Sequence, residues 1–267
     1  MTHAPCILDI GSVNSLVIIS DVHLDQRGDK LEQSFLSALE SIKNVEVLVL
    51  LGDIFDFVFA RKRFYAEYWL QVLIKLKELK ATGIKIYFVE GNHDFGFEHG
   101  ILNEFKSVFE AAGDFVLVAH HKHLGRIEMR HGDDIVCQPS YLKFRSVVKS
   151  GWFQSVFSVV PGLLLHTIFS KYAKLSRKKD DYRKLDSEFL KSSLLNYFNL
   201  LQNIPVPKAD TLIFGHIHVF CDDVIDSTRF LSGPDWLSCP SILQIRADGA
   251  VLRLPSTATE LPQKFVF

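Results

Sequence analysis

Several common signals are missing or weak in this chain of 267 residues. A formal net charge of −1 gives the whole protein no electrostatic reason to bind nucleic acid. No basic stretch followed by an apolar segment stands at the N-terminus, so no secretory signal is expected. Internal repeats and low-complexity linkers are also absent. The few cysteines form no Cys-x-x-Cys pair, which argues against a zinc knuckle or a disulfide framework and fits a reducing compartment: Cys6, Cys137, Cys221 and Cys239.

The composition is that of a folded protein with a sizeable core. Hydrophobic residues make up 48% of the chain, which excludes global disorder. A chain of this length is expected to form one large α/β domain over residues 1–267, or one such domain with an insertion. No obligate protein partner is inferred.

Three buried strands are predicted in the N-terminal half, and each is followed by polar side chains. Short apolar runs rich in β-branched residues predict strands at 16–20, 45–51 and 84–90. Apolar residues at steps of three and four predict helices over 30–43 and 65–80 between them. Right-handed crossovers between parallel strands bring the strand ends together, so four side chains should converge: Asp21, His23, Asp53 and Asn92.

The loop after the third strand reads Gly91-Asn92-His93-Asp94. Asn92 offers a neutral oxygen ligand, and His93 can donate or accept a proton. Asp94 is placed to hold the tautomer of the neighbouring imidazole, as carboxylates do in other histidine-dependent sites. The loop therefore predicts catalytic roles for His93 and Asp94.

The C-terminal half supplies further imidazoles at strand ends. His131 follows a strand predicted at 125–130, and His216 and His218 follow one predicted at 211–214. The neighbouring cluster of His120, His121 and His123 is interpreted as a solvated hairpin turn. The remaining elements expected here are a helix at 101–112 and strands at 115–119, 242–245 and 251–254.

Seven side chains at strand ends are too many ligands for one metal ion and the right number for two. Asp53 is the best bridge, since a carboxylate can give one oxygen to each cation. Two ions roughly 3.5–4 Å apart can clamp an in-line phosphoryl displacement and generate a hydroxide near neutral pH. The predicted metal ligands are Asp21, His23, Asp53, Asn92, His131, His216 and His218.

With these motifs in this order, the chain resembles the calcineurin-like metallophosphoesterases. The resemblance implies a two-sheet α/β sandwich flanked by helices. It implies that one metal takes Asp21, His23, Asp53 and His218, and that the other takes Asp53, Asn92, His131 and His216. Mixed imidazole, carboxylate and carboxamide ligands suit Mn²⁺, with Fe, Zn or Mg as alternatives.

Between His131 and His216 the chain contains His131-Gly132-Asp133, then Tyr141 with Phe144-Arg145, a long helical segment, and Ser176-Arg177. In these residues it resembles the UDP-2,3-diacylglucosamine diphosphatases of lipid A synthesis. The resemblance implies hydrolysis of the substrate pyrophosphate to UMP and 2,3-diacylglucosamine 1-phosphate. It also implies a cytoplasmic protein peripherally associated with the inner membrane, with a lipid-linked nucleotide as its substrate. The substrate-binding residues implied are Asn92, His93, Tyr141, Phe144, Arg145, Ser176 and Arg177.

Two positions depart from that family. Its best-known branch has arginine where His93 stands, and an acidic pair where Gln138-Pro139 stands. The substrate could therefore be another nucleotide or a phospholipid phosphoester. A non-catalytic scaffold of the same fold is a further alternative, but it predicts eroded ligands, whereas all the ligand positions are filled here.

The resemblance places a helical lid at residues 140–200. Residues 151–175 are apolar and aromatic, and Pro161-Gly162 should divide them into two helices, which makes them a poor membrane-spanning segment. A basic cluster from Lys171 to Lys179 adjoins them. An apolar helical face beside basic residues suits an anionic membrane surface or a lipid phosphate, and the helices could cover acyl chains. The alternative is that these residues form only a small core and a solvated face.

Overall fold

The computed structural model describes most of the chain, including every predicted metal ligand. The described residues are 6–97, 103–135, 139–179, 192–193, 195–196, 207–218, 220–225, 227–233, 236 and 240–255; of 103, 139, 140 and 172–179 only the backbone is described.

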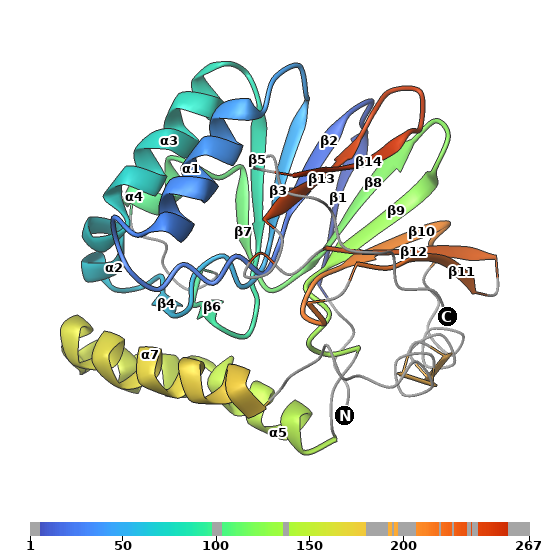
Figure 1. Ribbon diagram of the computed structural model, residues 1–267. Helices are drawn as coiled ribbons and strands as arrows, with labels where there is room; N and C mark the ends of the chain where they lie inside the picture. The colour runs from blue at the N-terminus through green and yellow to red at the C-terminus, as the bar shows by residue number, and fades with distance from the viewer. Residues whose placement is uncertain are drawn as a thin grey trace.

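The strands form two sheets that face one another (Figure 1). The first sheet has the order β14 (Val251–Pro255), β13 (Ser241–Ile245), β2 (Leu16–Ile19), β3 (Val47–Leu51), β5 (Lys85–Val89) and β7 (Ala111–Gly113). Its strands β2, β3, β5 and β7 are parallel to their neighbours in that series, whereas β13 runs antiparallel to β2 and to β14.

The second sheet carries the strands of the C-terminal half. Its order is β1 (Ile7–Ser12), β8 (Val116–His121), β9 (Gly125–Arg130), β10 (Thr211–Phe214), β12 (Thr228–Ser232) and β11 (Asp222–Ile225). Strand β10 lies between β9 and β12 and is parallel to both. The carboxyl ends of β9 and β10 therefore lie side by side.

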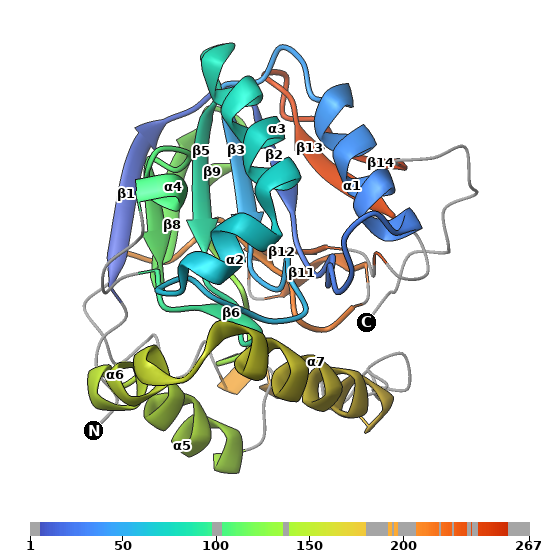
Figure 2. The same ribbon diagram turned by 90° about the vertical axis from the view of Figure 1, so that its left-hand side faces the viewer.

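Side-chain alternation along the central strands builds two hydrophobic clusters. On β3, Leu48 and Leu50 point toward the helices, while Val47, Val49 and Leu51 point toward the other sheet. Burial on both faces explains why this strand is an uninterrupted apolar run. The predicted two-sheet sandwich flanked by helices is confirmed. The helices on the outer side of the first sheet are α1 (Lys30–Ser41), α2 (Arg63–Tyr68), α3 (Leu70–Ala81) and α4 (Asn103–Lys106) (Figures 1 and 2).

Three predicted elements differ in the structure. The helix expected at 65–80 is two helices, α2 and α3, with a break at Trp69, whose buried ring packs against Phe55. The prediction of a helix over 101–112 is wrong except for the short helix α4, because residues 111–113 pair with β5 as strand β7. Tertiary pairing there outweighs the helix propensity of alanine. The histidine cluster is not wholly a solvated turn, since His121 lies in β8 and is buried.

A helical segment lies beyond the strand ends, next to the small sheet of β4 (Val58–Phe59) and β6 (Asp94–Phe95) (Figure 2). It consists of α5 (Pro139–Val148), α6 (Gly151–Val159) and α7 (Gly162–Lys179). The division predicted at Pro161-Gly162 is confirmed, and the chain bends there by 115°. Among the described residues no single helix is long and apolar enough to cross a membrane, although α6 and residues 162–171 pass that test as a bent pair by length and composition alone.

Candidate metal centre

The predicted ligands converge from both sheets at one end of the sandwich. Asp21 and His23 follow β2, Asp53 follows β3, and Asn92 follows β5, all in the first sheet. The second sheet adds the remaining three through the loops after β9 and β10: His131, His216 and His218. The topological expectation that strand ends bring these side chains together is therefore met.

The backbone of these loops is unusual. Five of the predicted ligands have left-handed φ angles between 53° and 67°, a region that residues other than glycine rarely adopt: Asp21, His23, Asp53, His216 and His218. Backbone in this region costs of order 1–3 kcal/mol per residue and persists where surrounding structure enforces it. The loops thus store strain at the point where polar side chains gather.

Backbone hydrogen bonds between the loops enforce that geometry. The N–H groups of Asp21 and His23 donate to the carbonyls of Gly52 and Asp53, at 3.1 and 3.0 Å. The N–H of His216 donates to both carboxylate oxygens of Asp21, at 2.9 and 3.0 Å, and so joins the two sheets. Added side chains at Gly91 and Gly215 would collide with the carboxylates of Asp53 and Asp21.

The ligand atoms fall into two overlapping groups. In one group, His23 Nε2 lies 3.3 Å from His218 Nε2, and His218 Nε2 lies 3.8 Å from Asp21 Oδ1. In the other, His131 Nε2 lies 3.1 Å from Asn92 Oδ1 and 3.4 Å from Asp53 Oδ2, and His216 belongs to the same group. Asp53 Oδ2 also lies 4.0 Å from His23 Nε2. Asp53 therefore stands between the two groups.

These spacings fit cations. Atoms bound about 2.1 Å from one ion lie roughly 3.0–3.4 Å apart in octahedral or tetrahedral coordination. The closest separations at this site, 3.1 to 3.4 Å, fall in that range. A carboxylate and imidazoles in each group are the donor types that Mn²⁺, Fe and Zn accept. The residues thus fit a metal centre.

Electrostatics inside the site follow from burial and close carboxylates. Burial lowers the pKa of His131, but the Asp53 carboxylate outweighs it and raises that pKa to about 10. Burial, together with the charge on His131, lowers the pKa of His216 to about 3. For Asp53, burial acts to raise the pKa, yet the imidazoles of His131 and His93 hold it well below its usual value. The site therefore favours an ionised carboxylate surrounded by imidazoles.

A neighbouring contact orients one ligand ring. His131 Nδ1 lies 3.1 Å from the carbonyl oxygen of Leu51, which can only accept a hydrogen bond. This contact favours the tautomer that leaves Nε2 free to face Asp53 and Asn92. Outer partners of this kind commonly fix metal-bound histidines.

The role expected for Asp94 is corrected by its contacts. Its carboxylate accepts hydrogen bonds from four backbone N–H groups, those of Asp53, Ile54, Phe55 and Gly91, at 2.7 to 3.2 Å. Burial and the Asp53 charge raise the pKa of Asp94 to about 7. The carboxylate thus shapes the Asp53 loop, and the His93 ring has another partner.

That other partner is Asp56, for which the sequence motifs predict no role. His93 Nδ1 lies 2.8 Å from the Asp56 carbonyl oxygen, and His93 Nε2 points to the site, 3.9 Å from Asp53 Oδ2. An Asp56 carboxylate oxygen also lies 3.7 Å from His23 Nδ1. Asp56 could be identified from the motif Gly52-Asp53-Ile54-Phe55-Asp56, because it follows Asp53 closely at the end of the same strand.

The implied substrate-binding residues are placed differently. Tyr141 and Arg145 form hydrogen bonds to the Asp133 carboxylate, whereas Phe144 is exposed on α5. The side chains of Ser176 and Arg177 lie outside the described part of the chain, as does Gln138. The histidine cluster of the β8–β9 hairpin lies at the end of β9 opposite His131, where His121 Nε2 lies 3.2 Å from the Asn14 carbonyl oxygen.

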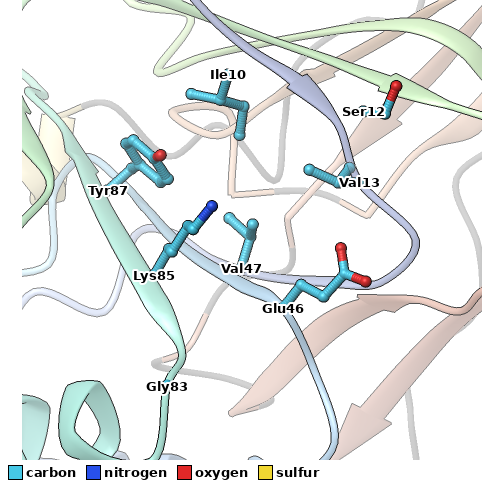
Figure 3. A pocket seen from close by; sticks show the side chains of 8 residues that line it. All are labelled: Ile10, Ser12, Val13, Glu46, Val47, Gly83, Lys85 and Tyr87. Carbon is cyan, nitrogen blue, oxygen red and sulfur yellow. The ribbon is translucent and has the colours of Figure 1, made fainter.

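A hollow of about 170 Å³ lies at the opposite end of the sandwich (Figure 3). Its polar wall includes Glu46 and Lys85, which stand where β3 and β5 begin. The Glu46 carboxylate accepts hydrogen bonds from the N–H and the amide of Asn14, at 2.9 and 2.7 Å. This hollow is separate from the metal ligands, which lie where the same strands end.

Comparison with known proteins points to one family. The family model described as calcineurin-like phosphoesterase matches residues 15–220. A UDP-2,3-diacylglucosamine hydrolase of Vibrio parahaemolyticus is 27% identical over 247 residues, covering 89% of this chain and 96% of the relative. One of Vibrio cholerae is 30% identical over 249 residues, covering 85% and 93%. A solved archaeal phosphodiesterase is 15% identical with a TM-score of 0.43, covering 90% of this chain and 99% of its own.

Proposed function

This chain belongs to the calcineurin-like phosphoesterases and is a metal-dependent phosphoester hydrolase, and we propose that its substrate is UDP-2,3-diacylglucosamine. The products would be UMP and 2,3-diacylglucosamine 1-phosphate, a step of lipid A synthesis. The observation that carries the proposal is the near full-length match to hydrolases of that name, combined with a helical segment beyond the ends of the strands (Figure 2).

Two divalent ions, most simply Mn²⁺, would be held by the two groups of ligands. The first group is Asp21, His23, Asp53 and His218, and the second is Asp53, Asn92, His131 and His216. When bound, such ions lower the pKa of water and neutralise charge on phosphoryl oxygens. The chain contributes the geometry, because strained loops and hydrogen bonds between the sheets hold the side chains in place before any ligand arrives.

His93 would act on the phosphoryl group. Its Nδ1 is anchored on the Asp56 carbonyl, so its Nε2 is the atom aimed at the site. From there it can donate a hydrogen bond to a phosphoryl oxygen or to the leaving oxygen, and its backbone N–H donates to Asp53 Oδ1 at 2.9 Å. Asp94 supports this arrangement by shaping the loop that carries Asp53.

The helical segment would receive the lipid part of the substrate through its outer face. On the inner face, Phe157 packs against Phe169 and Phe169 stacks on Phe57, with ring centroids 5.4 and 4.4 Å apart. These aromatic rings occupy part of the space between the helices and the core, so the proposal places the acyl chains against the outer face. The outer face instead exposes large apolar side chains: Trp152, Val156, Val159, Leu163, Leu164 and Ile168.

That outer face would also rest against an anionic membrane. Its apolar side chains lie on α6 and α7, and residues 171–179 of α7 add a run of lysines and arginine in sequence. Apolar helical surface plus basic residues is the composition of interfacial helices. We therefore propose a peripheral location on the cytoplasmic side of the inner membrane. Co-sedimentation with vesicles containing anionic lipid tests it, with loss of binding at high salt expected.

The position of attack gives a direct test of the reaction. A small nucleophile attacking the phosphorus on the uridine side expels a sugar phosphate, which is already a stable anion. Hydrolysis in ¹⁸O-labelled water should then place the label in UMP. Label in the lipid phosphate would reverse the direction of attack, and the absence of turnover would contradict the proposed substrate.

A second candidate is a phosphoesterase for another nucleotide or phospholipid. The observation that favours it is His93 in place of the arginine of the best-known branch of these diphosphatases, since this side chain faces the site. Assays on UDP-2,3-diacylglucosamine, nucleotide diphosphates and phospholipids in parallel separate the two. Faster cleavage of another class would favour the second candidate.

A further inference from the structure

One face of α5 carries three polar side chains that meet carboxylates of the sandwich. Tyr141, Arg145 and Lys149 follow one another at intervals of four residues, which places them on the same side of a helix. Lys149 stands just past the last residue of α5, and its N–H still donates to the Arg145 carbonyl at 2.9 Å. The three side chains therefore form a row directed at the ends of the sheets.

The contacts of this row are short and mostly buried. Arg145 Nε and Tyr141 OH each donate to Asp133 Oδ2 at 2.8 Å. Arg145 Nη2 donates to Asp114 Oδ1 at 2.6 Å. Lys149 Nζ donates to Glu90 Oε2 at 2.9 Å and lies 3.7 Å from Asp114 Oδ2.

The three carboxylates come from both sheets and from the connection between them. Glu90 follows β5 of the first sheet, Asp133 follows β9 of the second, and Asp114 lies between β7 of the first sheet and β8 of the second. Arg145 and Lys149 together thus link the ends of the two sheets. Two of these carboxylates also adjoin ligands, because Glu90 stands two residues before Asn92 and Asp133 stands two residues after His131.

We propose that Arg145, assisted by Lys149, is a positioning residue that holds the ligand-bearing ends of the two sheets at the separation the metal centre needs. The ligands come from both sheets, so the spacing between those ends sets the spacing between ligand atoms. The inference rests on the proposed metal centre. It gives Arg145 a role through Asp133 and Asp114 in place of the substrate contact implied by sequence.

The chemistry of the row suits this role. Asp133 and Glu90 are buried, and a buried carboxylate that loses its partner is strongly destabilised. A planar guanidinium can serve two carboxylates at once from fixed directions, whereas an ammonium acts as a point charge.

The test compares Mn²⁺ binding by metal-depleted variants of the full chain. Equilibrium dialysis of Mn²⁺ measures affinity, and Mn²⁺ titration of the hydrolysis of a water-soluble phosphodiester measures the requirement in turnover. Arg145→Met should weaken Mn²⁺ binding by about 10–100-fold, the usual cost of losing an outer partner of a metal site. Arg145→Lys should fall between that variant and the wild type, and excess Mn²⁺ should restore much of the activity of both.

A matched control removes an arginine–aspartate pair away from the ligands. Arg229 on β12 binds Asp222 with two hydrogen bonds of 2.9 and 3.2 Å, near the start of β10 and so at the end opposite His216. Arg229→Met should leave Mn²⁺ affinity unchanged. Equal weakening in this control would mean that Arg145 acts only through general stability, and would overturn the inference.

A second variant keeps the inference testable if Arg145→Met does not fold. Asp114→Asn removes the charge that Arg145 meets on the connection between β7 and β8, and Asp114 is 26% exposed, so the change is mild. It should weaken Mn²⁺ binding several-fold, less than Arg145→Met. Unchanged affinity in both variants would overturn the positioning role while leaving the metal centre standing. A wild-type protein that binds no Mn²⁺ would instead overturn the proposed function itself.

Discussion

The ligand loops and the outer face of α6 and α7 are opposites in physical character. In the loops, Asp21 and Asp53 are almost wholly buried and tied by hydrogen bonds, on strained backbone. On the helices, Trp152 is 65% and Val159 81% exposed, on regular backbone. The loops hold polar atoms together at a cost in backbone strain, whereas the helices leave large apolar side chains exposed to water. The first region gathers the candidate metal ligands, and the second presents the apolar surface for which we propose membrane binding.

The largest effect is expected from removing Asp53, the residue shared by both ligand groups. Asp53→Ala deletes the carboxylate that stands between His23 and His131. We expect loss of activity and lower occupancy of both metals, since each group loses a donor. Metal analysis of the purified variant together with a phosphodiester assay checks this. Near wild-type activity with two metals retained would contradict the assignment.

A smaller effect is expected for His93. Because its ring is not needed to complete either ligand group, His93→Ala should lower kcat by roughly 10²–10⁴-fold, the range for a lost proton donor or charge stabiliser. Metal content should hold. Loss of a metal would make His93 a ligand, which its position 3.9 Å from Asp53 Oδ2 makes a meaningful alternative.

Replacing Asp94 should lower the stability of the protein, whereas replacing its neighbour His93 should lower kcat. Asp94→Ala leaves four backbone N–H groups around the Asp53 loop without their acceptor. Hydrogen bonds to a charged group contribute about 1.5–3 kcal/mol each, and partial relaxation should leave a net loss of about 3 kcal/mol. Urea unfolding of the metal-depleted protein measures it, at a pH above the Asp94 pKa of about 7 so that the carboxyl is ionised. Unchanged stability with reduced kcat would restore the catalytic role expected from sequence.

The ligands were predictable from sequence because their signals are local. A polar residue directly after a buried strand is visible in the chain, and parallel crossovers require such ends to meet, as they do for Asp21, Asp53 and Asn92. Contacts that depend on distant packing were not predictable. Arg145 reaches Asp114 across 31 positions, and no periodicity in either segment specifies that pairing.

The same limit explains the errors in the elements. Ala111 and Ala112 favour a helix, yet residues 111–113 pair with the edge of β5 as strand β7. The sequence suggests Asp94 as the partner of the His93 ring because the two residues are adjacent in the chain. In the structure the ring instead contacts the Asp56 carbonyl, which is adjacent in space. The inward and outward faces of α6 could not be separated from a sequence that is apolar on both.

A position on the inner face of α6 should contribute to the stability of the fold, as core positions of the two sheets do. Phe157 packs against Phe153 and the hydrophobic core, so Phe157→Ala creates a void at that contact. Because the ring is only partly buried, we expect a loss of about 2 kcal/mol in unfolding free energy, below the usual value for a core phenylalanine. Val159→Ala, at an exposed position on the same helix, should change it by less than about 0.5 kcal/mol. Equal effects would mean that the faces of α6 are not distinct.

The smallest effect is expected from two exposed residues of α7. It should appear with the lipid substrate and not with a soluble phosphodiester. Leu164 and Ile168 are about half exposed on α7, four residues apart on one face. Replacing both with aspartate puts charge on the outer face without entering the core. Hydrolysis of a soluble phosphodiester should be unchanged, whereas hydrolysis of UDP-2,3-diacylglucosamine in mixed micelles should fall roughly tenfold through a higher KM, since the apolar contact is lost. The matched control is Leu142→Asp, which adds a charge at a comparably exposed position on a different helix, α5. Equal losses on both substrates would mean that the outer face serves only the fold.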